Sequence, residues 1–443
     1  MDQREAKNAV VALIGEDGIA AAHAPIEEAS GLPNAAYVSD DWLTLERDRI
    51  FARTWIFVAA EAEFDAIGVQ KPVEVAGAPV VLVRSATGIN AFHNVCRHRG
   101  AQLVDAPCEK STVTCPYHQW TYGLDGDLRS RPHFGGPGVN SRFDGNAGPS
   151  LDLVPVRCAV WNGCVFVNLD GSAEPVETWI APFVDIAGEY DFTTVRWAGK
   201  IDFEVDANWK FVFENYMEGY HVFSLHPALL KHAPMNTRWS GEWVQSVFHN
   251  GYIAPKLTPG RGDELPHYPG LTDEQTRAGR WFLIFPTFGA EVFADQFCVL
   301  TAHPVAPDRT REEIHIFLIG DEAATGDRYR EAREGIFAMW DALNREDLDA
   351  VERLQKGRRS PAYDGGRLSP HWESPTHQLG AHVIDVILGG WTSLSSSRRQ
   401  RSAVFRSRTD SSSGLTAQGC PKADSLEPAR SPTTRPESAT TSV

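Results

Sequence analysis

The feature that most constrains this chain is a pair of short Cys/His motifs in its first half. Cys96-x-His98 is followed, after 16 intervening residues, by Cys115-x-x-His118. Pro116 has no N–H and a fixed φ, which suits a tight loop. The fold must therefore hold two matching loops side by side, each presenting one thiol and one imidazole.

The alternation of Cys and His indicates a particular kind of metal site. In a Rieske [2Fe–2S] centre, one iron takes two cysteines and the other takes two histidines, and each loop supplies one of each. Structural zinc sites also use two of each, but zinc fingers usually take both cysteines from one hairpin and both histidines from a helix. Unligated core residues are a third interpretation. The pattern favours a Rieske cluster held by Cys96, His98, Cys115 and His118.

A second candidate metal site involves His221 and His226. Five positions span roughly 140° on a regular helix, so both imidazoles can meet one metal only if the helix is wound or broken there. Pro227 is compatible with a break, and Glu218 precedes His221 by about one turn. Two imidazoles and a carboxylate leave positions open on iron(II), the facial-triad arrangement. Taken alone, the pair could also be a core histidine and a loop residue.

The carboxylate must come from elsewhere, and helical periodicity suggests its position. The stretch Glu334–Leu354 is predicted to be a helix. Its apolar stripe consists of Trp340, Leu343, Val351 and Leu354. Asp347 lies within about 20–40° of each of these at 100° per residue, whereas Glu346 and Asp349 should point away. A carboxylate on an apolar face needs a partner, and a cation is the obvious one.

The pattern of apolar and turn-forming residues divides the chain into an N-terminal segment (1–36) and three further parts. In 37–195, short apolar runs such as Val80–Val83 and Cys164–Val167 are punctuated by Gly, Pro and Asn, which is typical of an antiparallel β domain. In 196–385, helical patterns flank longer strand-like runs, which predicts an α+β domain on an antiparallel sheet. Those runs are Trp281–Phe285, Glu291–Thr301 and Glu313–Leu318.

The last part, 386–443, has a different composition. Between Trp391 and Val443, 20 of 53 residues are Ser or Thr, with 8 Arg or Lys against 4 Asp or Glu. Such a stretch cannot bury enough apolar surface to offset its ordering entropy, so we expect a disordered tail. A shifted reading frame or an extension would also explain its abrupt start.

Overall composition excludes several classes of protein. A net charge of −16 argues against a broad nucleic-acid footprint. No apolar run approaches the roughly 18–20 residues needed to cross a bilayer, and no secretory signal is visible. Seven scattered cysteines argue against a disulfide scaffold. We therefore expect a cytoplasmic protein, and without a nucleotide-binding glycine motif any nicotinamide or flavin should reside on another chain.

Together these motifs resemble the large (α) subunit of Rieske non-haem iron ring-hydroxylating oxygenases, over roughly Tyr37–Gly357. Outside the cluster motifs, the matching residues are Glu218, His221, His226, Glu346, Asp347 and Glu352. The resemblance implies a Rieske domain joined to a helix-grip catalytic domain. It also implies a [2Fe–2S] cluster and a mononuclear Fe(II) bound by the two histidines and Asp347.

The resemblance further implies a mono- or dioxygenase that hydroxylates or oxidatively dealkylates a small organic substrate with O2. Electrons would come from a separate NAD(P)H-dependent reductase or ferredoxin. In the family, an acidic residue three positions before the first iron-ligand histidine bridges it to a cluster histidine of a neighbouring subunit. Glu218 holds that place and His118 matches the cluster partner, which implies a head-to-tail ring, commonly a trimer. Glutamate there is similar to the branch acting on quaternary ammonium compounds.

Two other functions stay open at this point. An electron-transfer Rieske protein would lack oxygenase activity, but such proteins usually carry an extra cysteine in each loop, where this chain has Ala101 and Tyr117. A zinc-stabilised ligand-binding protein is the other.

The expected substrate is a small organic molecule, an aromatic ring compound or a quaternary ammonium compound, and aromatic side chains could enclose a flat ring or cage a cation. The aromatic residues near the predicted iron site are Trp209, Phe211, Phe213, Trp239, Trp281, Phe285, Phe288 and Phe293. Such an aromatic-rich stretch is more often plain core, so these residues do not decide between the two.

Overall fold

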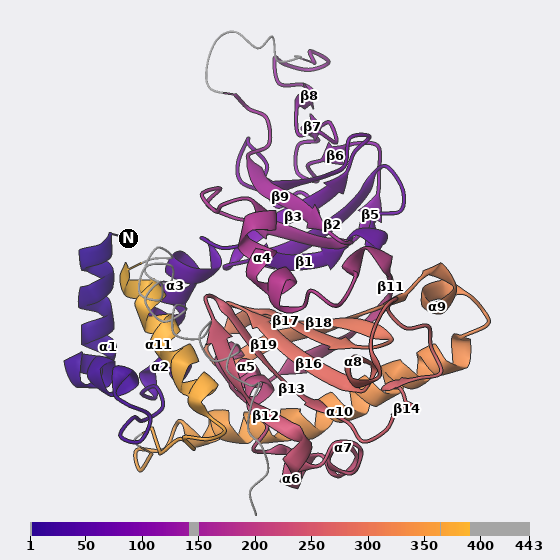
Figure 1. Cartoon of the computed structure of the whole chain (residues 1–443). Helices are drawn as coiled ribbons and strands as arrows, with labels where there is room; N and C mark the ends of the chain where they lie inside the picture. The colour runs from indigo at the N-terminus through magenta and orange to yellow at the C-terminus, as the bar shows by residue number, and fades with distance from the viewer. Residues whose placement is uncertain (1, 141–149, 364, 390–443) are drawn as a thin grey trace, which may run out of the picture. The chain divides into compact units, whose positions relative to one another are not determined.

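The two ends of the described chain pack against each other. The computed structural model describes residues 2–140, 150–363 and 365–389. α1 (Gln3–His23) lies beside α11 (Ser374–Gly389), as Figure 1 shows. Between α1 and the first strand come α2 (Ala35–Val38), α3 (Asp40–Glu46) and a π-helical turn (Arg47–Phe51).

The first domain is built from antiparallel β-sheets. Its seven-stranded sheet has the order β1-β10-β9-β4-β3-β2-β5, and a small three-stranded sheet, β6-β7-β8, stands beside it. The strands of the first sheet, in that order, are Ile56–Ala60, Cys164–Asn168, Pro155–Trp161, Ile89–His93, Ala78–Arg84, Val69–Val75 and Cys108–Glu109. The strands of the small sheet are Val113–Thr114, Thr121–Tyr122 and Leu128–Ser130.

The second domain is centred on a seven-stranded antiparallel sheet with the order β11-β19-β18-β17-β16-β13-β12. In that order its strands are Val195–Val205, Arg309–Ile319, Gln296–Ala306, Phe288–Phe293, Ala278–Ile284, Val247–Ile253 and Arg238–Val244. The remaining short elements are α4 (Val176–Ile186), α8 (Asp273–Thr276), α9 (Asp321–Thr325), β14 (Thr258–Pro259) and β15 (Gly262–Asp263).

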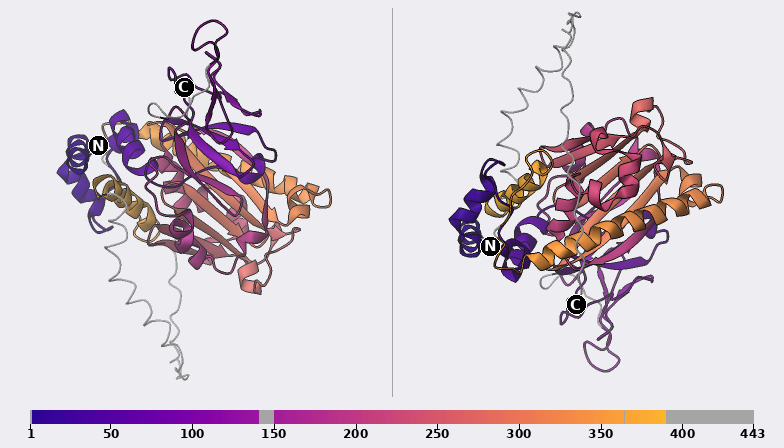
Figure 2. Two further views of the ribbon diagram at one scale, coloured as in Figure 1. Left: turned by 90° about the horizontal axis from the view of Figure 1, so that it is seen from above. Right: turned by 90° about the horizontal axis from the view of Figure 1, so that it is seen from below.

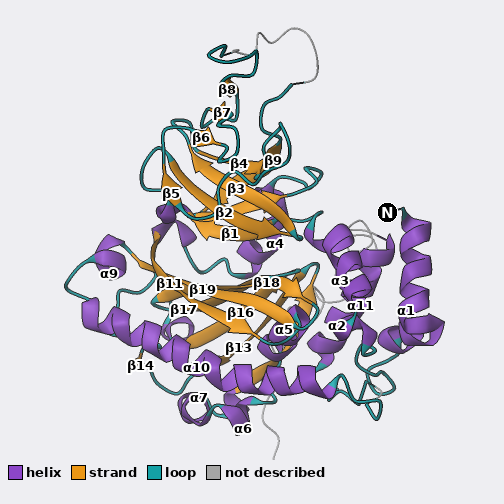
Figure 3. Ribbon diagram, turned by 180° about the vertical axis from the view of Figure 1, so that it is seen from behind, coloured by secondary structure: helices purple, strands orange, loops and turns teal. Residues whose placement is uncertain are grey.

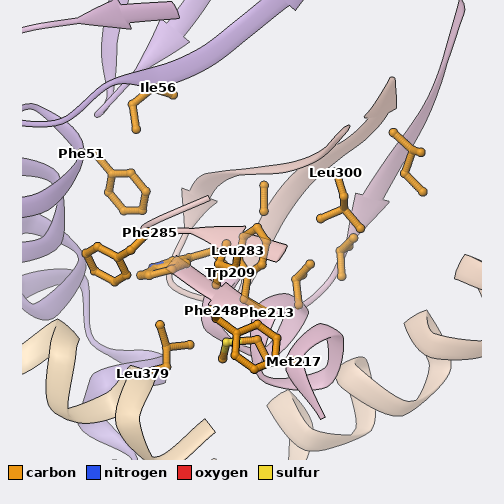
Figure 4. Packing of buried hydrophobic residues seen from close by; sticks show 14 of the residues in the cluster. Phe51, Ile56, Trp209, Phe213, Met217, Phe248, Leu283, Phe285, Leu300 and Leu379 are labelled. Atoms are coloured by element: carbon orange, nitrogen blue, oxygen red, sulfur yellow. The ribbon is translucent and has the colours of Figure 1, made fainter. Parts of the chain in front are cut away.

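Each face of this second sheet has a different neighbour, because successive side chains in a strand point to opposite sides. On one face, Phe288 shares a buried cluster with Phe57 of the first domain, with ring centroids 5.8 Å apart. On the other face, Leu300 shares a buried cluster with Trp209 and Phe213 of α5 (Trp209–Met217), part of which Figure 4 shows. The candidate site lies on this helix-covered face.

The helix-covered face carries α5, the short helices α6 (Val222–Leu225) and α7 (Pro227–His232), and the long α10 (Arg330–Gly357). Figures 2 and 3 show α10 lying along the sheet. Within the described ranges, no helix is both long and apolar enough to cross a membrane.

The α+β class and the two antiparallel sheets confirm the predicted fold class. The expected single strand over Glu291–Thr301 is wrong, because β17 ends at Phe293 and β18 starts at Gln296. The chain turns at Ala294-Asp295, which contains neither Gly nor Pro to mark the turn.

The predicted boundaries at 37 and 386 fall inside helices, α2 and α11 respectively. Val386 and Ile387 are buried in the core, so residues 386–389 belong to the folded domain rather than to the tail. The rest of the predicted tail, 390–443, lies outside the described residues.

Candidate active site

Backbone hydrogen bonds close the two Cys/His loops in the same way. The N–H of Cys96 donates to the carbonyl of Ala101 at 2.8 Å, and the N–H of Cys115 donates to the carbonyl of Trp120 at 2.9 Å. Gly100, in the first loop, has φ of +77°, a conformation that glycine adopts without steric cost. Each loop is thus a tight turn whose ends are tied together.

The four candidate cluster ligands separate by chemistry and by depth. The thiols of Cys96 and Cys115 are buried, with residue exposures of 3% and 2%, whereas His98 and His118 are exposed. The two imidazole rings lie 4.8 Å apart between centroids. This sorting of thiols to one side and imidazoles to the other suits two metal atoms with different ligands better than a single tetrahedral zinc.

Aromatic side chains support both kinds of ligand. The ring of Trp120 stacks on His98 with centroids 4.9 Å apart. The hydroxyl of Tyr122 lies 3.5 Å from Cys96 Sγ and accepts a hydrogen bond from the N–H of Arg97 at 3.0 Å. Burial raises the pKa of Cys96, partly offset by the Tyr122 hydrogen bond, so a metal is needed to hold this thiol as a thiolate.

The helix carrying the candidate iron ligands is broken, as the five-residue spacing predicts. α5 ends at Met217 and Glu218 has extended backbone (φ −109°, ψ 148°). His226 lies between α6 and α7 with φ −117° and ψ 71°, which is not helical. These two interruptions allow His221 and His226 to converge.

Asp347 of α10 completes the predicted set of three ligands. His226 Nε2 lies 2.9 Å from Asp347 Oδ1, and His221 Nε2 lies 3.6 Å from the same oxygen. One ligand atom from each residue falls within 4.8 Å of the others. Two imidazoles and one carboxylate at this spacing fit a single metal ion with open coordination positions.

A glutamate holds the other nitrogen of each imidazole. His221 Nδ1 lies 2.6 Å from Glu218 Oε1, and His226 Nδ1 lies 2.6 Å from Glu346 Oε2. Nδ1–H donation to a carboxylate leaves the Nε2 lone pair free for a metal, as in carboxylate–histidine–metal units. Burial lowers the pKa of His226, but the hydrogen bonds and charges of Asp347 and Glu346 outweigh it and raise the pKa above 6.5. The negative charge of Asp347 and Glu346, which favours a proton on His226, also favours a metal cation beside it.

The position of Glu346 corrects the sequence analysis, which expected it to point away from the site. Its Cα direction is about 100° from that of Asp347, but the longer side chain reaches round to His226. Trp340 and Val351 are buried on α10 as predicted, whereas Leu354 is 49% exposed and is not part of the stripe.

A pocket opens beside the three ligands, and few of the predicted aromatic residues line it. Of the eight predicted, only Trp239 and Trp281 do so. The other six are buried in the core: Trp209, Phe211, Phe213, Phe285, Phe288 and Phe293. Lining residues that the sequence analysis missed include Tyr216, Arg238, Glu291, Glu312 and Trp372, whereas Trp340 was expected beside Asp347 on the same helix. A glutamate inside an otherwise apolar strand, as at Glu291, is the signal that could have found part of this set.

Comparisons with known families match both halves of the chain. The Rieske [2Fe-2S] domain matches residues 54–141, and the catalytic domain of the ring hydroxylating alpha subunit matches residues 192–389.

Relatives of known function align over most of the chain. The glycine betaine monooxygenase oxygenase subunit of Chromohalobacter salexigens is 29% identical over 80% of this chain and 84% of its own. The carnitine monooxygenase oxygenase subunit of Escherichia coli K12 is 28% identical over 81% of this chain and 95% of its own. Choline monooxygenase of Spinacia oleracea is 26% identical over 80% of this chain and 78% of its own.

Solved structures share the fold. The apo form of a quaternary ammonium Rieske monooxygenase superposes with a TM-score of 0.64 at 25% identity, covering 84% of this chain and 98% of the other. Naphthalene 1,2-dioxygenase from Rhodococcus sp. superposes with a TM-score of 0.65 at 20% identity, covering 86% and 99%. These findings exclude a pure electron-transfer protein and imply a [2Fe–2S] cluster together with a mononuclear iron. The chain belongs to the Rieske non-haem iron ring-hydroxylating oxygenases, as an alpha subunit.

Proposed function

We propose that this oxygenase hydroxylates a C–H bond next to the nitrogen of a small quaternary ammonium compound, which leads to C–N cleavage. The observation that carries the proposal is the pocket beside the candidate iron ligands, which is lined by Trp239, Trp281, Trp340 and Trp372. Tryptophan faces bind quaternary ammonium groups by cation–π attraction. Relatives named for glycine betaine, carnitine and choline support the same substrate class.

The proposed ligands follow from the geometry. Cys96, His98, Cys115 and His118 would hold the cluster, and His221, His226 and Asp347 would hold the iron. The cluster supplies single electrons, and the iron supplies open positions for chemistry with O2. The chain's own contribution is to orient both imidazoles through Glu218 and Glu346 and to enclose the substrate among aromatic side chains.

We also propose a head-to-tail assembly, a trimer, in which Glu218 of one subunit meets His118 of the next. In Figure 1, the β6–β8 sheet and the α6–α7 segment lie at opposite ends of the described fold. Large apolar side chains are exposed at both places: Tyr117 beside His118, at 58%, and Phe223 close to Glu218, at 55%. Subunits of this family work with a separate reductase, and we propose an NAD(P)H-dependent one in the cytoplasm.

A single-turnover experiment tests the substrate class without the native reductase. The iron-loaded protein is reduced chemically, mixed with O2 and one of glycine betaine, carnitine or choline, and its products are measured by mass spectrometry with 18O2. C–N cleavage of the hydroxylated compound gives a tertiary amine without label and an aldehyde that carries one 18O atom. Both are the expected products, with the aldehyde reduced to its alcohol at once so that the label does not exchange with water. Oxidation of naphthalene or indole in the same assay, with none of the three quaternary ammonium compounds consumed, would contradict the proposal.

A further inference from the structure

The floor of the substrate pocket contains two buried carboxyl groups, on two strands of the second sheet that are separated by β18. Glu291 lies on β17 and Glu312 on β19, and both side chains line the pocket. Their residue exposures are 1% each. In the strand register, Glu291 is directly opposite Trp281 on β16, so an aromatic ring and a carboxyl group stand side by side in the lining.

The carboxyl of Glu291 lacks the partners that a buried acid normally has. Its Oε2 atom is buried and has no hydrogen-bond partner among the described residues. Glu312 has one, since Asn344 Nδ2 donates to its Oε1 at 2.7 Å. A buried polar group without a partner costs free energy, so its retention in a pocket calls for a ligand that satisfies it.

The adjacent residue, Glu313, shows how the same strand treats a structural carboxylate. Glu313 faces the other side of the sheet, where its carboxylate lies 3.1 Å from Lys200 Nζ and 3.0 Å from His315 Nε2. Burial opposes its ionisation, but His315, His303 and Lys200 outweigh that effect and hold its pKa well below the ordinary range. Within the part of the chain that the structure describes, neither Glu291 nor Glu312 forms an ion pair with a lysine, arginine or histidine.

Two arginines, Arg238 in the pocket lining and Arg261 close to Glu291, carry positive charge in this region. Arg261 lowers the pKa of Glu291 through its field, yet Glu291 Oε2 has no hydrogen-bond partner among the described residues. Arg261 instead donates to Met339 Sδ and lies over the rings of Phe293 and Trp340. Burial raises the pKa of Glu312 to about 8 and that of Glu291 well above its ordinary value, and each is raised further by a neighbouring carboxylate. Arg238, which also lines the pocket, donates to the carbonyl of Ala233 at 3.2 Å and lies over the ring of Tyr252, so among the described residues neither arginine forms an ion pair with the two carboxyls.

We propose that Glu291 and Glu312 form an anionic floor: entry of the positively charged nitrogen of the substrate favours ionisation of these two carboxyl groups, and the resulting charge makes the site select cations over neutral molecules of the same shape. This inference rests on the proposed function and names the residues that determine its specificity. The tryptophans supply apolar and cation–π contact, which a neutral aliphatic group also partly enjoys. The carboxyl groups add a full electrostatic preference for a charged nitrogen over an uncharged carbon, beyond the weaker cation–π preference of the tryptophans. A flat hydrocarbon would leave both carboxyls without a partner.

Binding measurements on matched ligand pairs test the proposal without turnover. The pairs are choline with 3,3-dimethylbutan-1-ol, and glycine betaine methyl ester with methyl 3,3-dimethylbutanoate, in which an uncharged carbon replaces the charged nitrogen. Tetramethylammonium serves as the smallest cation. We expect the wild-type holoprotein to prefer the charged member of at least one pair. In Glu291→Gln and Glu312→Gln, affinity for the cation should fall by about 10-fold or more, while affinity for the neutral isostere stays the same or improves.

Two isosteric variants and a surface control keep the test decisive. Asp349→Asn removes one charge from the exposed side of α10, where Asp349 pairs with Arg353, and should bind all ligands as the wild type does. Cluster absorption, iron content and thermal unfolding confirm folding of each variant. Equal loss of charged and neutral ligands, unchanged cation affinity in both Gln variants, or no cation binding by the wild type would overturn the anionic floor. Cation binding that depends on Glu291 without any turnover of quaternary ammonium compounds would instead refute only the proposed function.

Discussion

The two proposed metal sites of this chain are assembled over very different lengths of sequence. The cluster ligands come from two tight loops between Cys96 and His118, each closed by its own backbone hydrogen bond. The iron ligands come from the broken segment after α5 and from α10, more than a hundred positions later, where Asp347 meets His221 and His226. The first site depends on local loop geometry and the second on helix packing. Changes that loosen the packing of α5 or α10 should therefore damage the iron site while sparing the cluster.

The largest expected effect comes from removing a ligand of one site only. Asp347→Ala removes the carboxylate of the three-residue set, so oxygen insertion should fall to background, while the visible and electron paramagnetic resonance spectra of the cluster persist. Cys115→Ser should do the reverse and abolish the cluster spectrum. If Asp347→Ala oxidised substrate at near wild-type rates, the iron-site assignment would be wrong.

The next effect concerns the buried carboxylate of Glu46, at the end of α3, which pairs with Lys210 at the start of α5. Glu46 accepts hydrogen bonds from Lys210 Nζ at 2.6 Å, Trp209 Nε1 at 2.8 Å and Trp42 Nε1 at 2.9 Å. Glu46→Ala leaves the buried Lys210 without its ion-pair partner, which should cost about 3–5 kcal/mol. Because Lys210 lies in α5, we expect iron occupancy to fall before cluster content does, measured by metal and sulfide analysis of the purified variant.

This comparison also separates two kinds of buried acid. Glu46 is saturated with partners and serves stability, whereas Glu291 has an unpartnered oxygen in the pocket. Glu291→Gln should therefore unfold at or above the wild-type temperature. A large loss of stability in Glu291→Gln would indicate that it too is a structural residue.

A smaller effect is expected from Glu346, which holds Nδ1 of His226. Glu346→Gln should reduce iron affinity or turnover by about 10–100-fold, the usual range for a residue that orients a metal ligand. Glu352→Gln, a partly exposed position of the same helix, is the control, since Glu352 lies 3.8 Å from Lys356 and does not line the pocket. Equal effects of the two substitutions would show that Glu346 acts through helix stability alone.

On the cluster side, Tyr122→Phe removes the hydroxyl next to Cys96 Sγ. Hydrogen bonds to the sulfur ligands raise the reduction potential of an iron–sulfur cluster, so the potential should fall in the variant. Folding should be affected by only about 1 kcal/mol, since one hydrogen bond is lost. A redox titration followed by visible absorption checks this, and an unchanged potential would mean that the hydroxyl only supports the loop through Arg97.

The same contrast explains what could be predicted from sequence. The cluster motif is local, so residue types and spacing identify all four proposed ligands. The break between His221 and His226 also follows from spacing, and helical periodicity places Asp347. Glu346 was misassigned because Cα directions ignore the reach of a long side chain. Glu291 and Glu312 escaped notice because their meeting in one pocket depends on the register of β17, β18 and β19, which a single strand pattern does not contain.

The smallest expected effect tests the helical frame that joins the chain's two ends. His23 Nε2 contacts Asp385 Oδ1 at 2.9 Å, and this hydrogen bond raises the pKa of His23 above 6.5 despite partial burial. A histidine whose pKa is raised on folding stabilises the fold fully below pH 6.5 and loses that contribution as pH rises through the raised value. Because the two side chains are 37% and 46% exposed, the contribution should be only about 0.2–1 kcal/mol. Unfolding midpoints of the wild type and His23→Gln, measured in denaturant across this pH range, should therefore differ at acid pH and converge at alkaline pH. A constant difference at every pH would show that His23 contributes by packing α1 against α11 rather than through its charge.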